Sequence, residues 1–308
     1  MCRSGTLHLV GLGMGLCDVT VKGFDILNAC APHTYVDETT RLILNAMGSH
    51  SEGLTYEVDI SVVTRLKTLL NLDTAGVTPD TCGAALAMAR GGADVAVAVW
   101  GDPLVFTDYS DLLQAAVGEQ VNIAVVHNAS LLNTIASCGL HLYTFGETVQ
   151  FPRPDQSIDG SAKQLLVKDK DSFFNRITRN HNAGWHTLCL LHCTASSTAS
   201  CSSLVMQCWT PADACRLLLS LLSESGETSG PTSGDPSSES SRLTSSCECV
   251  TVTGFGGALK LRRGPLAALA QEHSPAVAPV SALIITGLLH PMERDCLSLL
   301  AEDCQEVQ

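Results

Sequence analysis

The sequence predicts an α/β fold made of two α/β domains, and three observations support this prediction. Apolar runs of strand length alternate with helical patterns along the first half of the chain. Three of these runs lead directly into turns rich in glycine or small polar residues, as in wound sheets that bind ligands at strand carboxyl ends. The chain has 308 residues, of which 45% are hydrophobic, so it is long enough for two packed cores.

The expected elements follow from the spacing of apolar residues. Continuous apolar runs predict buried strands, and apolar residues at every third or fourth position predict helices. In the first half, strands are expected at 7–10, 34–36, 94–100 and 121–126, and helices at 20–30, 41–47, 61–72, 84–89 and 111–117. In the second half, strands are expected at 187–192, 250–253 and 282–286, and helices at 173–180, 211–222 and 291–301.

The chain is expected to divide near residue 120, into an N-terminal α/β domain at 1–120 and a C-terminal α/β domain at 121–308. Residues 223–246 of the second domain are rich in Ser, Thr, Gly, Glu and Pro and almost devoid of apolar side chains. Such a segment buries too little apolar surface to offset the entropy of ordering it, so we expect a disordered insert.

Charge and cysteine usage narrow the class of protein. The net charge of −13 does not favour nucleic acid or anionic membranes as partners. No apolar run reaches the ~18–20 residues of a membrane span, and we expect a cytoplasmic protein. The fourteen cysteines include no CxxC pair, which predicts free, mostly buried thiols and no zinc site. The closest pair, Cys247 and Cys249, is expected to point to opposite faces of a strand.

The first ligand-binding candidate is the glycine turn at 11–15, between a strand and a helix. Glycines let the backbone turn tightly and approach a ligand closely. The turn fits a dinucleotide site of the Rossmann kind, with Asp37 near the ~20-residue offset of a ribose-binding acid. A purely structural turn fits equally well, so this motif alone leaves both interpretations open.

Two further turns follow buried strands. Asp102, in Gly101-Asp102-Pro103, either holds a ribose hydroxyl or a cationic sulfonium, or caps the next helix. In the turn at 127–130, Ser130 either caps a helix or contacts a ligand, and His127 more often has a structural role in such a position. Three such turns at three strand ends indicate a ligand site more strongly than any one of them.

Several long strings of the sequence closely resemble the diphthine synthases. The strings in the first half are 10–13, 18–23, 101–103, 127–130, 138–143 and 145–149, and those in the second half are 172–174, 184–191, 284–287 and 290–293. They follow one another in the family's order, and the resemblance covers nearly the whole chain outside the serine-rich insert.

The resemblance implies the fold of the tetrapyrrole methylases, in which two α/β domains hold S-adenosylmethionine in the cleft between them, usually in a homodimer. It implies cofactor contacts at Met14, Asp102, Val105, Ser130, Leu131, Leu191, Phe255 and His290. The chain departs from the family pattern at Val105, where glycine is common, at 106–109, and at His192, where aspartate is common. A β-branched residue at positive φ is a costly outlier, so we expect a negative φ at Val105.

The implied reaction is repeated methylation of the amino group of a 3-amino-3-carboxypropyl histidine on elongation factor 2, during diphthamide biosynthesis. Eukaryotic members add a further methyl as a carboxylate ester. The attacking amine must be neutral, yet no residue of the sequence identifies itself as the proton acceptor, and His290 is a weak candidate. No metal is required.

Three other functions stay open at this point. A tetrapyrrole-type methylase shares the fold and cofactor but lacks the family-specific strings at 127–130 and 139–148. A nicotinamide dehydrogenase explains the glycine turn and Asp37 but leaves the turns at 101–103 and 127–130 unexplained. A catalytically degenerate binding protein is suggested by the insert and by the departures around Val105.

Overall fold

The computed structural model describes residues 4–36, 40–41, 43–44, 60–70, 81–105, 109–153, 158–191, 193–197, 204–225, 242–255, 259–272 and 280–302. The chain forms two compact units, Met1–Thr134 and Ile135–Gln308. The division therefore falls after Thr134 and not near residue 120. The reason is that strand β4 (Asn122–Val126) pairs with strand β1 (Thr6–Gly11) in the sheet of the first unit.

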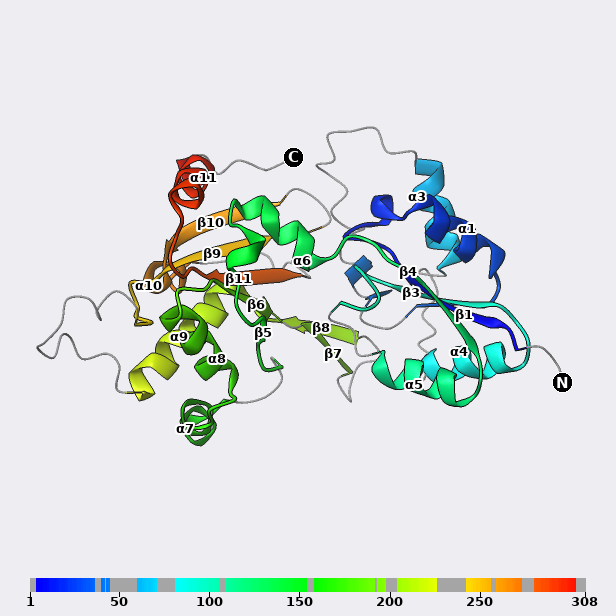
Figure 1. Cartoon of the computed structure of the whole chain (residues 1–308), viewed down its shortest axis with the longest axis horizontal. Coiled ribbons are helices and arrows are strands. Elements are labelled where there is room, and N and C mark those ends of the chain that lie inside the picture. The colour runs from blue at the N-terminus through cyan, green and yellow to red at the C-terminus, as the bar shows by residue number, and fades with distance from the viewer. Residues whose placement is uncertain are drawn as a thin grey trace, which may run out of the picture. The chain divides into compact units, whose positions relative to one another are not determined.

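The first unit is a four-stranded parallel sheet with helices on both faces (Figure 1). Its strand order is β2-β3-β1-β4, with β2 at Thr34–Val36 and β3 at Val95–Val99. Helices α1 (Val21–Ala29) and α3 (Ile60–Leu69) lie on one face, and α4 (Thr81–Arg90) and α5 (Ser110–Gly118) on the other. All of β3 is buried, as its continuous apolar run predicts.

Alternation along β3 assigns its residues to two cores. Val97 packs in the same cluster as Ala85 of α4 and Leu112 of α5. Ala98, the next residue, packs in the cluster of Leu27 and Leu66 from α1 and α3. The strand period of two therefore places the larger side chains of β3 toward α4 and α5 and its alanines toward α1 and α3.

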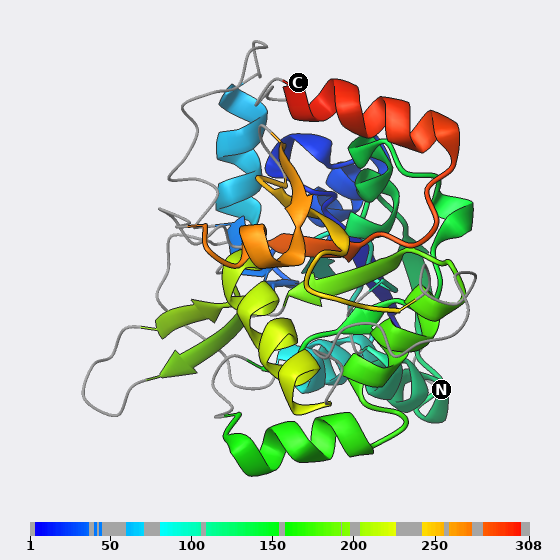
Figure 2. The same ribbon diagram turned by 90° about the vertical axis from the view of Figure 1, so that its left-hand side faces the viewer.

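The second unit contains a five-stranded mixed sheet of order β10-β9-β11-β6-β5. Its strands are β5 (Val149–Gln150), β6 (Thr187–Leu191), β9 (Glu248–Thr253), β10 (Lys260–Pro265) and β11 (Ser281–Ile285). All neighbours are antiparallel except β5 and β6. A separate hairpin of β7 (Cys193–Ser197) and β8 (Leu204–Cys208) stands apart from this sheet (Figure 2).

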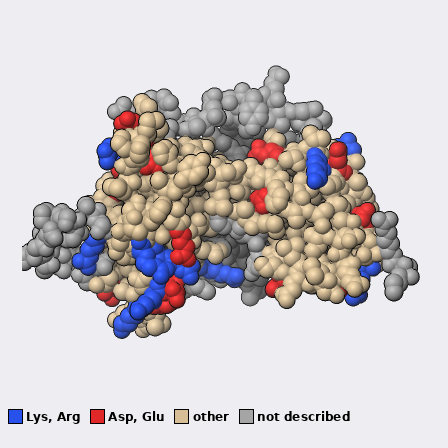
Figure 3. Space-filling view, in the orientation of Figure 1, with Lys and Arg blue, Asp and Glu red and all other residues tan. Residues whose placement is uncertain are grey.

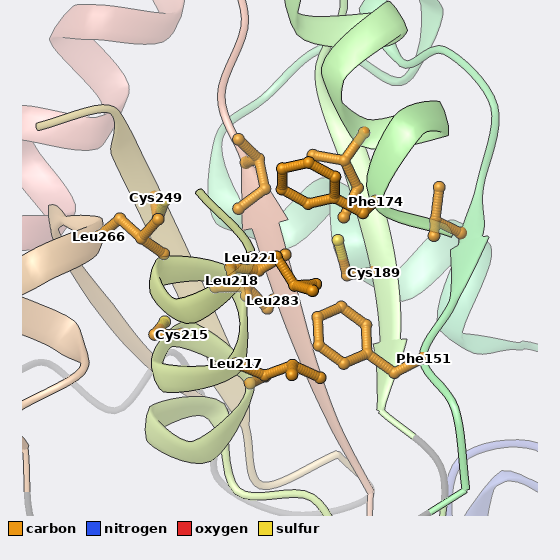
Figure 4. Packing of buried hydrophobic residues seen from close by; sticks show 14 of the residues in the cluster. Phe151, Phe174, Cys189, Cys215, Leu217, Leu218, Leu221, Cys249, Leu266 and Leu283 are labelled. Carbon is orange, nitrogen blue, oxygen red and sulfur yellow. The ribbon is translucent and has the colours of Figure 1, made fainter. Parts of the chain in front are cut away.

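The second unit contains helices α7 (Gly160–Lys168), α8 (Phe173–Asn182) and α9 (Pro211–Glu224), the short helix α10 (Leu266–Leu269) and the closing helix α11 (Pro291–Glu302). The short helix α6 (Leu131–Thr134) ends the first unit. Figure 4 shows the main core, where Leu217 and Leu221 of α9 meet Leu283 of β11 and Phe174 of α8. Burial of these side chains fixes α8 and α9 on the sheet.

Lys and Arg side chains gather beside Asp and Glu over α7 and α8 (Figure 3). Arg176 and Arg179 both pair with Glu147, at 3.1 and 3.5 Å, and Arg179 lies 3.9 Å from Asp171. These pairs are partly exposed and contribute little to stability. Arg176 and Arg179 are therefore offset by neighbouring acids.

The elements predicted at strong apolar patterns are confirmed, except that most of the helix expected at 41–47 lies outside the described residues. Helix α7, strand β10 and the β7–β8 hairpin were not predicted. The expected insert is narrower than 223–246, because α9 continues to Glu224 and Leu243 is fully buried. The rest of that prediction, residues 226–241, lies outside the described residues, as do Asp37, 106–108 and His192.

Nine described cysteines are free, among them Cys189 and Cys215 in the core. Cys208, however, is disulfide-bonded, so the prediction of free thiols is wrong there; the hairpin register places Cys193 opposite it. The expectation that Cys247 and Cys249 point to opposite faces is wrong: Cys249 belongs to the core cluster and Cys247 packs against it. The reason is that residues two apart along an extended segment share a face. Within the described ranges, no helix has the length and apolarity needed to span a bilayer.

Candidate functional site

Three turns meet at the carboxyl edge of the first unit's sheet, where β3, β1 and β4 end side by side. Gly13 and Gly101 exchange backbone hydrogen bonds of 3.2 and 2.8 Å, which joins the first two turns. Both glycines have positive φ, 76° and 77°, a conformation that L side chains rarely adopt. The two sequence motifs are therefore halves of one structural unit.

Asn128 joins the third turn to the first. Its Nδ2 donates to the carbonyl oxygens of Gly11 and Asp18, at 3.0 Å each. A Cβ on Gly11 would lie 2.7 Å from the Gly101 oxygen and 3.0 Å from the Cβ of Asn128. The three turns are thus close-packed, and glycine at position 11 is what permits their approach.

Asp102 holds the second and third turns together. Its Oδ1 accepts a hydrogen bond from Leu104 N at 2.9 Å. Its Oδ2 accepts from Asn128 N at 3.1 Å and lies 2.8 Å from His127 Nδ1. Burial alone would raise the pKa of Asp102, but these hydrogen bonds outweigh burial and hold the pKa below its usual value. The carboxylate is ionised and oriented by its own chain, and the side chain of its partner His127 is 66% exposed.

Asp18, which sequence reasoning missed, occupies the amides of the glycine turn. Its Oδ2 accepts from Met14 N at 3.1 Å and from Gly15 N at 2.9 Å. A dinucleotide site needs such amides to bind pyrophosphate, and a carboxylate beside them repels phosphate. The arrangement therefore disfavours the nicotinamide dehydrogenase. The sequence did contain a signal for this contact, because an acid three residues after Gly15 is at the spacing at which a side chain reaches back to the backbone N–H groups of a turn.

The other predicted residues of the first unit line the same turns. Met14 is buried, and its carbonyl accepts from Trp100 Nε1 at 3.1 Å. Val105 is half-buried, and its N–H donates to Asp102 O at 3.1 Å. Gln120 is the one non-glycine residue at positive φ in the described part of the chain, so Val105 has the negative φ that was expected.

Ser130 and Leu131 are buried at the start of α6. Ser130 N donates to Asn133 Oδ1 at 2.6 Å, and Ser130 Oγ lies 3.2 Å from the same oxygen. The hydroxyl of Ser130 is therefore held by the first turn of α6. Because the hydroxyl donates its proton to Asn133, it can only accept hydrogen bonds from a ligand, through its lone pairs.

In the second unit, the structure separates the three predicted cofactor residues. Leu191, at the end of β6, pairs with Ser281, which also pairs with Thr253 just before Phe255. His290 instead follows the far end of β11, where Ile285 pairs with Thr187 and Cys249. Because β11 runs antiparallel to β6 and β9, its start and not its end lies beside Leu191. His290 therefore follows the opposite end of this sheet from Leu191 and Phe255, and its contact with a cofactor stays a prediction.

His290 begins helix α11. Its Nδ1 accepts from Met292 N at 3.2 Å, and its own N–H donates to Glu293 Oε2 at 2.8 Å. This is a reciprocal cap, in which the third helical residue reaches back to the residue before the helix. The sequence signal was Pro291 followed two positions later by a glutamate. His290 has a capping role here, which leaves it a poor candidate for proton acceptor.

Glu293 is fully buried and joins several segments of the second unit. Its Oε1 accepts from His141 N at 2.8 Å, from Thr144 Oγ1 at 3.1 Å and from His186 Nε2 at 3.2 Å. Burial would raise the pKa of Glu293, but the hydrogen bonds to the backbone of His141 and His290 and the neighbouring His186 lower it to about 2.

His186 is also fully buried, and its contacts fix its tautomer. Gly287 N donates to His186 Nδ1 at 2.8 Å, so the proton of a neutral ring lies on Nε2 and faces Glu293. Burial lowers the pKa of His186 more than the glutamate raises it. The pair is a neutral imidazole donating to a buried carboxylate, an arrangement that stabilises the fold.

Comparison with known proteins identifies both a family and individual relatives. A family model described as Tetrapyrrole (Corrin/Porphyrin) Methylases matches residues 6–175. Diphthine methyl ester synthase of Mus musculus is 32% identical over 189 residues, which cover 60% of this chain and 58% of the mouse protein. The protein of the same name from Saccharomyces cerevisiae is 29% identical over 189 residues, covering 60% and 54%. The matched segment thus spans less than two thirds of these relatives.

Solved structures extend the likeness of fold to the whole chain. A crystal structure of diphthine synthase matches with a TM-score of 0.64 and 18% identity, covering 97% of this chain and 96% of that one. A conserved hypothetical protein from Aeropyrum pernix K1 matches with a TM-score of 0.65 and 20% identity, covering 99% and 92%. Both likenesses support the predicted α/β fold class.

Proposed function

Because the chain belongs to the tetrapyrrole (corrin/porphyrin) methylase family, we propose that it is an S-adenosylmethionine-dependent methyltransferase of the diphthine methyl ester synthase type. Its substrate is the 3-amino-3-carboxypropyl histidine of elongation factor 2, which it methylates repeatedly during diphthamide biosynthesis. The observation that carries the proposal is the set of three joined turns in the first unit, in a chain whose curated relatives bear that name.

The chemistry of these turns suits a sulfonium cofactor better than a phosphate. Asp18 and Asp102 place two carboxylates at the sheet edge, and Asp18 occupies the amides of Met14 and Gly15. A Cβ on Gly101 would meet no atom closer than 3.9 Å, so the backbone there leaves room for a ligand. Carboxylates attract the cationic end of S-adenosylmethionine and repel pyrophosphate.

S-adenosylmethionine, when bound, supplies a methyl group on a good leaving group, so the protein must mainly align the acceptor and exclude water. In the first unit we assign its contacts to Met14, Asp102, Val105, Ser130 and Leu131. In the second unit we assign its contacts to Leu191, Phe255 and His290, as the family resemblance implies. We add Val280 and Ser281 at the start of β11, because the register places that segment beside Leu191.

We assign the proton acceptor to His127. Asp102 accepts from its Nδ1, which leaves Nε2 as the nitrogen that takes a proton, and the side chain is 66% exposed. A base oriented by a third group is the usual arrangement in general base catalysis. His127→Gln should lower kcat by about 10²–10⁴-fold with little change in cofactor affinity, whereas His33→Gln should leave both unchanged. An unchanged kcat, or a parallel loss of affinity, would remove His127 from this role.

The proposal extends to location and assembly. The net charge of −13 suits a cytoplasmic protein that acts on another protein, with neither nucleic acid nor membrane as a direct partner. We propose a homodimer on the strength of the family resemblance. Sedimentation of the full chain, with dimer mass expected, tests this part separately.

The decisive experiment incubates the full chain with S-adenosylmethionine and elongation factor 2 carrying the unmethylated intermediate. Mass spectrometry of the modified peptide should show mass increments of successive methyl groups. Calorimetry in parallel should show binding of S-adenosylhomocysteine and none of NAD. Cofactor binding without methylation of this substrate would favour a tetrapyrrole-type methylase, and absence of binding would indicate a catalytically degenerate protein.

A further inference from the structure

A cysteine and a histidine form a close pair at the start of β9. Cys247 Sγ lies 3.4 Å from Nε2 of His181, which belongs to the last turn of α8. Cys247 is a free thiol of intermediate exposure, so reagents in solution reach it. Neither residue belongs to the three turns of the first unit.

Further contacts orient both partners of this pair. His181 Nδ1 lies 3.1 Å from the carbonyl oxygen of Thr286, which accepts its proton and directs Nε2 toward the sulfur. Thr244 N donates to Cys247 Sγ at 3.1 Å, and Thr244 Oγ1 lies 3.5 Å away. His181 Nε2 and the N–H and hydroxyl of Thr244 are thus three neighbours that stabilise a thiolate, whereas the carbonyl oxygen of Arg242, 3.7 Å from the sulfur, favours the thiol. Nucleophile, base and a third group that orients the base are the parts of an activated cysteine.

The electrostatics of the pair agree with this geometry. Burial would raise the pKa of Cys247, but the contacts with His181 and Thr244 outweigh burial and lower it. The pKa of His181 is raised, because its contacts with Cys247 and Thr286 exceed the effect of burial. Glu248, the next residue, pairs with Arg263, so its charge is offset. The core cysteines Cys189 and Cys249 instead have pKa values raised by burial, which makes them inert.

The pair also lies away from Leu191 and Phe255, two of the residues predicted to contact the cofactor in this unit. Cys247 precedes β9 and Thr286 follows β11, at the end of the sheet where Cys249 pairs with Ile285. Leu191 is at the opposite end, beside Ser281. A reaction at Cys247 therefore takes place at the other end of this sheet from Leu191.

We propose that Cys247 is a nucleophilic thiol that hydrogen peroxide oxidises to a sulfenic acid, with His181 as the group that takes and returns the proton. His181 Nε2 accepts the thiol proton, and the thiolate attacks one peroxide oxygen. A sulfur–oxygen bond forms while the oxygen–oxygen bond breaks, so the sulfur loses two electrons and peroxide is reduced. The leaving hydroxide takes the proton from His181 and becomes water.

The test treats the full chain with hydrogen peroxide and dimedone at slightly acidic pH and quantifies adducts by peptide mass spectrometry. Cys17 is the internal control, because it is more exposed than Cys247 yet its pKa is raised by burial and by Asp18. The adduct at Cys247 should accumulate several times faster than that at Cys17. Equal rates, or faster reaction at Cys17, would overturn the proposal.

A matched pair of variants isolates the role of the histidine. His181→Gln should slow labelling of Cys247 without affecting Cys17, and His33→Gln in the first unit should change neither rate. An unchanged Cys247 rate in His181→Gln would remove the histidine from the reaction. If His181→Gln does not fold, the pH profile of the unaltered protein decides: the Cys247 rate should persist at acidic pH after that of Cys17 has fallen. A parallel fall contradicts the proposal.

Discussion

Each unit contains a carboxylate that accepts two backbone N–H groups and a hydrogen bond from a histidine ring, but the two histidines differ in exposure. Asp102 of the first unit contacts His127, whose side chain is 66% exposed. Glu293 of the second unit contacts His186, whose side chain is fully buried, as is the glutamate. Similar contacts between a carboxylate and a histidine therefore occur once at an exposed position and once in a buried one.

The difference in exposure between His127 and His186 predicts a functional role for the first and a structural role for the second. A proton on exposed His127 exchanges with a substrate or solvent, and its Asp102 partner fixes which nitrogen does so. A proton on His186 has no such outlet, because Gly287 and Glu293 occupy both ring nitrogens. Substitutions at the buried pair should therefore affect folding, and substitutions at the exposed pair should affect binding and catalysis.

The largest effect is expected at the buried pair. Glu293→Ala leaves the N–H groups of His141, His290 and His186 without their acceptor in a site closed to water, and should lower the free energy of unfolding by about 3–5 kcal/mol. Urea denaturation measures this loss. Asp295→Ala, an exposed position on the same helix, is the control and should change stability little. A loss confined to activity would contradict the structural role.

Acid should destabilise the same pair. The pKa of Glu293 is about 2 in the folded chain against 4.5 for a free side chain, so its stabilisation is present above pH 4.5 and is lost as the pH falls toward 2. This amounts to about 3 kcal/mol. The pKa of His186 is lowered from 6.5, so protonation of the unfolded state adds a loss below pH 6.5. The free energy of unfolding should fall as the pH drops below 6.5 and fall again between pH 4.5 and 2. Glu293→Gln should reduce the pH dependence between pH 4.5 and 2.

The contrast also shows what the sequence could predict. Apolar periodicity was enough for the buried parallel strands, because β3 is apolar on both faces and leads into Gly101. The hairpin of β7 and β8 and strand β10 were missed, because Lys260–Pro265 is polar and depends on pairing with β9. Pairing between distant strands is not encoded in local periodicity.

The same limit applied to the sites. The three turns were predicted because each directly follows a strand, yet the contacts of Asn128 with Gly11 and of Asp18 with the glycine-turn amides needed the folded chain. The position of His290 at the opposite end of the second sheet from Leu191 could not be predicted, because the sequence does not give the direction of β11. The register of Ser281 with Leu191 supplies that direction.

An intermediate effect is expected at the exposed pair. Asp102→Ala removes the acceptor that orients His127 and the turn at Leu104, and should weaken binding of S-adenosylhomocysteine by ~1.5–3 kcal/mol in calorimetry. Asp111→Ala, an exposed acid in the first turn of α5, should leave the affinity unchanged. If Asp102→Ala lowered the melting temperature but left the affinity for S-adenosylhomocysteine unchanged, Asp102 would have a structural role like that of Glu293. The proposed difference between the two units would then be wrong.

The smallest effect is expected at Val105, which lies beside Asp102 where the resembling family commonly has glycine. Its negative φ costs a β-branched residue nothing, and its N–H donates to Asp102 O, so the turn keeps its shape with valine in place. Val105→Gly removes a half-buried side chain without releasing backbone strain, and should change cofactor affinity by less than tenfold, or ~1.4 kcal/mol. Calorimetry with S-adenosylhomocysteine measures this, with Val117→Gly on exposed α5 as a control for loss of a valine elsewhere in the unit. A gain of several orders of magnitude would mean that valine obstructs the site, and the exposed pair would then belong to a protein that has lost the family's activity.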